Sequence, residues 1–258
     1  MGNIDRSLEC YFVMTAGVFG AILIIIAAII TPNYSPLTNT ISELGYFQYK
    51  TLFSIAMVII GNSMIPFFFK LERELTSIEE SLRIIATAAA VFTAICISLV
   101  GVIPDLEYLN QFLLFHALVA VIAFGGSSIY ILLYSRLIQK AIAMPSYKGP
   151  PFRRFLSYFG YSIFIVFILL MILFIPIIEW LMFILIVVWN VATAYYLSKY
   201  KFSGLAGLYY TKDQFPEMLN HFTESLEILK SLNLEDSPEA ESLKNNISFL
   251  KDALNNNK

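Results

Sequence analysis

The chain of 258 residues is 58% hydrophobic and 14% charged, whereas a soluble globular domain is roughly one quarter charged. Its formal net charge of −2 argues against the basic surface that a nucleic-acid-binding protein needs. The two cysteines, Cys10 and Cys96, show no metal-ligand or disulfide spacing, so neither kind of site is predicted.

Apolar runs long enough to cross a bilayer recur along the chain. About 20 helical residues span the hydrocarbon core, and a backbone in lipid must satisfy its own hydrogen bonds, which favours helices. We predict six transmembrane helices, at residues 11–31, 51–69, 83–103, 109–134, 155–174 and 177–197. The first run is too long for the apolar part of a signal peptide and no cleavage site follows it, so we expect it to stay uncleaved.

The connection between the first two predicted helices, called the first loop below, is polar and punctuated by prolines. Its residues 32–45 carry Pro32, Pro36, Ser42 and Glu43 and no basic residue. We expect this loop to be structured and regard it as the first candidate for a functional site.

Basic residues alternate from one connection to the next. They are Lys70, Arg73 and Arg83 after the second helix, Arg136, Lys140, Lys148, Arg153 and Arg154 after the fourth, and Lys199 and Lys201 after the sixth. The other three connections hold Lys50 alone. The positive-inside rule therefore predicts a cell-membrane protein with both termini in the cytoplasm and the first loop outside, and residues 135–154 are predicted to be a basic cytoplasmic connector.

One histidine, His116, lies inside a predicted helix, and ionisable residues within membrane spans are functional candidates. Asp105 and Glu107 precede that helix on the predicted outer side, which Ser42 and Glu43 share. We therefore predict a ligand-binding site formed by Ser42, Glu43, Asp105, Glu107 and His116. Ser42, Asp105 and His116 also match a catalytic triad by residue type, although geometry defines a triad. The alternative is that His116 only holds the first loop in place.

Other polar residues in the spans predict packing rather than chemistry. Gly125 and Gly126 with the following serines are typical of close helix contacts, and Asn62 and Asn190 are predicted to donate hydrogen bonds between helices. Glu179 and Trp180 are predicted to be an interfacial anchor. One histidine and no lysine within the spans leave haem and retinal without ligands, so we predict no cofactor and no metal.

The composition changes after residue 201, which predicts two domains, 1–201 in the membrane and 202–258 in the cytoplasm. Residues 213–258 show two apolar stripes at helical spacing, separated by Ser237 and Pro238, which are typical of a helix start. We predict a helical hairpin. Because two short helices form only a thin core, we expect the hairpin to pack against the membrane domain or to mediate homo-oligomer or protein contacts. The fold class is therefore all-α: six transmembrane helices and a cytoplasmic hairpin.

The first loop also resembles the signature of a known family. The residues concerned are Pro36, Ile41, Ser42, Glu43, Leu44 and Gly45. They are similar to a block of domain-of-unknown-function family 998, and residues 100–104, His116 and Phe124 resemble its second block. The resemblance implies a prokaryotic six-span protein without an established reaction. It also implies a distant likeness to the Frag1/DRAM/Sfk1 group, whose eukaryotic members are linked to lipid handling.

Three functions are compatible with these patterns. The one we favour is non-enzymatic lipid binding or membrane organisation, with membrane lipids as partners and the first loop covering an outer site. The second is a hydrolase or transferase acting on lipid-linked substrates at the outer interface. The third is a small-solute transporter, which would need polar groups along the middle of the bundle.

Overall fold

The computed structural model describes residues 8–103, 110–145, 147, 149–199 and 215–231, together with single positions between 237 and 251. For residues 110–113 and 215–218 it describes the backbone alone. The chain separates into two compact units, Met1–Lys201 and Phe202–Lys258.

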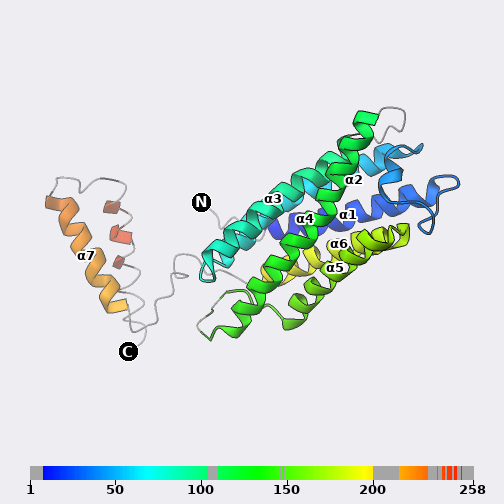
Figure 1. Cartoon of the computed structure of the whole chain (residues 1–258). Helices are drawn as coiled ribbons and strands as arrows, with labels where there is room; N and C mark the ends of the chain where they lie inside the picture. The colour runs from blue at the N-terminus through cyan, green and yellow to red at the C-terminus, as the bar shows by residue number, and fades with distance from the viewer. Residues whose placement is uncertain are drawn as a thin grey trace. The chain divides into compact units, whose positions relative to one another are not determined.

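The first unit contains six helices that are long and apolar enough to cross a membrane (Figure 1). They are α1 (Leu8–Ile30), α2 (Lys50–Glu74), α3 (Glu80–Val102), α4 (Asn110–Ala143), α5 (Arg154–Leu173) and α6 (Pro176–Lys199). The predicted all-α class and its six membrane helices are confirmed. Proline at the first position starts α6, where its missing N–H costs nothing.

The fourth helix is longer than predicted. We expected it to end near residue 134, but α4 continues to Ala143. Arg136 and Lys140 therefore lie in its final turns, where cations interact favourably with the helix dipole. The first proline after these turns is Pro145, so residues 135–143 contain no helix breaker and the prediction that they form a loop is wrong.

The six helices pack in chain order around a ring that closes where α1 meets α6. Neighbouring helices run in opposite directions, and α4 also contacts α6 across the ring. The first loop, residues 31–49, lies at one end of the bundle, called the loop end, beside the end of α3 and the start of α6 (Figure 1). This arrangement brings segments that are far apart in sequence to the first loop.

Glycines set the closest helix contacts. A Cβ at Gly61 of α2 would lie 2.5 Å from the Ala94 carbonyl oxygen of α3, and a Cβ at Gly126 of α4 would collide with Thr93. Small residues let membrane helices approach in this way. The packing role predicted for Gly126 is therefore confirmed.

The two asparagines differ in what they contact. Asn190 of α6 donates to the Tyr130 hydroxyl of α4 at 2.9 Å, as predicted. Asn62 instead donates to the Val58 carbonyl of its own helix and is exposed. The prediction of an interhelical role for Asn62 is therefore wrong, because its side chain points out of the bundle.

Basic residues gather at the opposite end of the bundle, called the basic end. Arg73 lies in the last turn of α2, Arg83 in the first turn of α3 and Lys140 in the last turn of α4, and Lys199 ends α6. Glu72 pairs with Arg83 and Glu79 pairs with Lys140, so acidic partners join α2, α3 and α4 there. The alternation read from the sequence thus gathers the basic residues at one end of the bundle.

The second unit is described in part. It contains α7 (Phe215–Ser231), and most described positions from 240 to 251 are helical. The amide of Ala240 donates to the Ser237 hydroxyl at 3.2 Å, which is the bond expected of a helix N-cap. Ala240 and Ile247, from one predicted apolar stripe, are both buried.

Candidate functional site

The first loop is held in shape by its own polar side chains. The Tyr34 hydroxyl donates to the Thr40 carbonyl at 2.6 Å, and Asn39 donates to the Glu43 carboxylate at 2.6 Å. A short 3-10 helix, η1 (Ser42–Gly45), follows. Burial raises the pKa of Tyr34, so the hydroxyl stays protonated and able to donate at a pH at which an exposed tyrosine would ionise.

The start of α6 fastens this loop to the bundle. Trp180 donates from Nε1 to the Asn39 carbonyl at 3.3 Å, and its ring meets Tyr34 edge-on at 6.2 Å between centroids. The backbone amides of Ile41 and Ser42 lie close enough to the Glu179 carboxylate to favour its charged form. Ile41 is 2% exposed, and its side chain forms part of the wall of a cavity inside the bundle.

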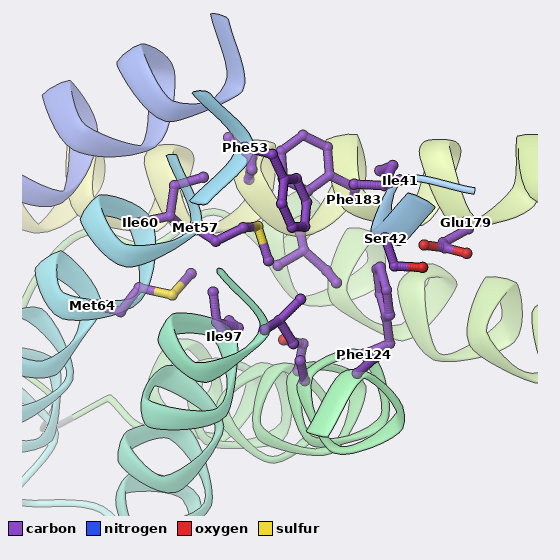
Figure 2. Close-up of a pocket in the computed structure, with 16 residues that line it drawn as sticks. Ile41, Ser42, Phe53, Met57, Ile60, Met64, Ile97, Phe124, Glu179 and Phe183 are labelled. Atoms are coloured by element: carbon purple, nitrogen blue, oxygen red, sulfur yellow. The ribbon is translucent and has the colours of Figure 1, made fainter. Parts of the chain in front are cut away.

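Below this contact lies an apolar cavity in the centre of the helix ring (Figure 2). The first loop and four helices supply its walls, and α1 and α5 do not. The lining residues are Ile41 and Ser42 of the first loop, Phe53, Met57, Ile60 and Met64 of α2, Ile97 and Val100 of α3, Ala120, Ala123, Phe124 and Ser127 of α4, and Glu179, Phe183, Ile186 and Val187 of α6.

The cavity is narrow, and its one ionisable side chain lies at the end nearest the first loop. Figure 2 shows Ser42 and Glu179 at one end and Met64 at the other. Glu179 and Val187 lie about two turns apart on α6, which gives a length on the order of 12 Å. Its volume is about 40 Å³, whereas ligand pockets are commonly about 300–1,000 Å³. A ligand would therefore enter only if side chains moved, and methionines such as Met57 and Met64 adapt readily.

The predicted site residues fall in different places. Ser42 lines the cavity, while its hydroxyl lies 3.1 Å from that of Thr40. Glu43 is engaged by Asn39 within the first loop. Asp105 and Glu107 lie outside the described residues.

His116 contacts a different part of the chain from the one predicted. It is 3% exposed, and its Nδ1 lies 3.1 Å from the Ile103 carbonyl at the end of α3. Ser42 and His116 thus each form hydrogen bonds to other groups, and the loop contacts described above come from Glu179 and Trp180. Among the described residues His116 Nε2 is buried without a hydrogen-bond partner, one turn before Ala120 on the cavity-facing side of α4.

Glu179 and Trp180 are the residues that sequence reasoning undervalued. They follow the first loop by at least 130 positions, so nothing in the local pattern linked them to Ile41, Ser42 or Asn39. An acid and a tryptophan at the start of a membrane helix are typical of an interfacial anchor. The available signal was that Glu179 is the single acidic residue of its predicted span.

A comparison with protein-family models finds a match over residues 14–196 to the protein family of unknown function DUF998. The chain belongs to the DUF998 family. This confirms the family that the first loop resembles, and the match spans both the first loop and Glu179. No curated protein and no solved structure matches this DUF998 protein. The likeness to the Frag1/DRAM/Sfk1 group stays a prediction.

Proposed function

We propose that this DUF998 protein binds the apolar part of a membrane lipid, or of a lipid-like molecule, in the central cavity, and that it does so without catalysing a reaction. The observation that carries the proposal is a cavity with apolar walls and one polar end. The first loop closes that end and is held there by contacts with the start of α6. Such a shape suits an amphipathic molecule, because the chain and the head each find a matching environment.

Two further features support this proposal. The first loop is fastened by hydrogen bonds and one aromatic contact rather than by a continuous helix, so it is the element that can move to admit a chain. The basic residues gathered at one end of the bundle favour a cytoplasmic location for that end, by the positive-inside rule. The end of the cavity that the first loop closes would then face the outer leaflet of the cell membrane.

The proposal can be tested with a substitution that fills the cavity and leaves its polar end unchanged. Ala123 is 6% exposed and lines the cavity, so Ala123→Leu inserts bulk where a ligand would lie. Leu118→Phe is the matched control on the same helix, because Leu118 is 55% exposed and lies outside the cavity. The readout is native mass spectrometry of the full-length protein released from nanodiscs.

We expect the wild type and Leu118→Phe to retain lipid and Ala123→Leu to lose it. The melting temperature of Ala123→Leu should be no lower than that of the wild type. Filling a cavity without strain does not reduce stability. Equal lipid retention in all three proteins, or no retained lipid in the wild type, would contradict the proposal.

A further inference from the structure

The polar end of the cavity offers acceptors and lacks a cation. Among the residues that line it, Glu179 is the one ionisable side chain, and none is basic. Glu43 is close enough for its charge to act on the Glu179 carboxylate. The end of the cavity nearest the first loop is therefore acidic.

One oxygen of the Glu179 carboxylate lacks a hydrogen-bond partner among the described residues. The amides of Ile41 and Ser42 lie close to this carboxylate, yet its Oε1 is buried without a hydrogen bond from the part of the chain that the structure describes. A buried acceptor left without a donor is costly, and in native proteins such an atom needs an explanation. A donor supplied by a ligand inside the cavity provides one.

The chemistry of that donor follows from the surrounding charge. A carboxylate or phosphate at this position would lie beside two acidic side chains without a compensating cation from the cavity wall, and like charges at short range repel. A hydroxyl could donate one hydrogen bond but would bring no positive charge to this acidic end of the cavity. An ammonium group supplies both donors and charge, and hydrogen bonds between charged groups are the stronger class.

We infer that the ligand is an amine with an apolar tail, held with its ammonium group on the free oxygen of Glu179 and its chain along the cavity. This inference rests on the proposed function and specifies the chemical class of the ligand that the cavity binds. Glu179 then has two roles, because it lies against the Ile41 and Ser42 amides of the first loop and binds the ligand through Oε1. The amine has two sources, a free alkylamine or the headgroup of an aminolipid.

The experiment measures the binding of decylamine, decanol and decanoate to the full-length protein in nanodiscs of choline-headgroup lipid. A second arm replaces part of that lipid with an ethanolamine-headgroup lipid and asks whether decylamine is displaced. Glu179→Gln removes the charge and keeps the shape, and Glu179→Asp keeps the charge. Glu79→Gln is the matched control, because Glu79 pairs with Lys140 at the basic end of the bundle and does not line the cavity.

We expect the wild type and Glu79→Gln to bind decylamine at least about tenfold more tightly than decanoate. Glu179→Gln should lose that preference while remaining folded by melting temperature, and Glu179→Asp should retain part of it. Displacement by the ethanolamine lipid would identify an aminolipid headgroup as the source, and the absence of displacement would identify a free amine.

Different results would overturn the ligand class, the role of Glu179 or both proposals. Amine and carboxylate binding equally, with both lost in Ala123→Leu, would overturn the ligand class and leave the cavity as a lipid site. A preference for the amine that survives in Glu179→Gln would overturn the role of Glu179. If none of the three molecules binds, or if Ala123→Leu binds them as well as the wild type, both proposals fail.

Discussion

At the scale of single residues, Tyr34 shows how a membrane protein holds a polar loop in place. Its ring contacts Phe47 and Trp180, while its hydroxyl donates to the Thr40 carbonyl at 2.6 Å. The apolar and polar parts of the side chain therefore act on the same loop. Removing the hydroxyl alone separates the two contributions.

Tyr34→Phe should loosen the first loop without unfolding the bundle. The ring contacts remain, and the lost hydrogen bond contributes about 1 kcal/mol. Limited proteolysis of the loop should therefore proceed several-fold faster in the variant, at an unchanged melting temperature of the bundle. Identical cleavage rates would show that the hydroxyl contributes nothing to loop order.

The raised pKa of Tyr34 predicts an alkaline limit to this order. Burial favours the neutral phenol, so the pKa in the folded loop is higher than the value of about 10 in an unfolded chain. The stabilisation is fully present below about pH 10 and is lost as the pH rises through the folded pKa. The protease protection that separates wild type from Tyr34→Phe should shrink above pH 10. A constant difference up to pH 11.5 would contradict this.

At the scale of elements, helix contacts depend on positions where no side chain fits. Gly61 is the clearest case, since its would-be Cβ faces the α3 backbone, which cannot turn away as a side chain can. Gly17 of α1 has ordinary space instead, with the nearest atom of Val191 at 3.5 Å. The two glycines therefore predict opposite effects of the same substitution.

Gly61→Ala should destabilise the bundle, and Gly17→Ala should not. Overpacking costs about 1–3 kcal/mol, whereas alanine is preferred over glycine by roughly 0.5–1 kcal/mol where space allows. Thermal unfolding in detergent should place Gly61→Ala below the wild type and Gly17→Ala at or above it. Equal melting temperatures would mean that α2 and α3 are packed less tightly than described.

The ion pairs at the basic end provide a second test of element packing. Glu72 and Arg83 join α2 to α3 with side chains 22% and 10% exposed, whereas the Glu79 and Lys140 side chains are 46% and 42% exposed. Removing one partner leaves the other charge poorly compensated, and solvent screens the exposed pair. Glu72→Gln should lower the melting temperature clearly, and Glu79→Gln should change it little.

At the scale of the whole molecule, the ring of helices turns a one-dimensional charge pattern into two chemically different ends. Acidic and aromatic side chains of the first loop and α6 occupy the loop end, and Arg73, Arg83 and Lys140 lie at the basic end. The orientation predicted from these charges can be tested by chemical labelling, because the native Cys10 and Cys96 are both buried.

Leu37→Cys should react with a membrane-impermeant maleimide in intact cells, and Met144→Cys only after permeabilisation. Both positions are exposed, Leu37 in the first loop and Met144 after α4 at the basic end. The wild type measures the background from its own cysteines. Labelling of Met144→Cys but not Leu37→Cys in intact cells would reverse the proposed orientation.

The six helices, the alternating charge and the family could be predicted from the amino-acid sequence, because hydrophobic length and basic loops are local properties of the chain. The sequence also singled out the first loop and Ser42. The residues on which the loop rests could be seen only in the folded chain. The fastening through Glu179 and Trp180, the position of His116 beside Ile103 and the cavity beneath Ile41 depend on how α6, α3 and α4 close the ring. Contacts of this kind join residues far apart in the chain, and apolar helices with similar faces leave their pairing unspecified until they pack.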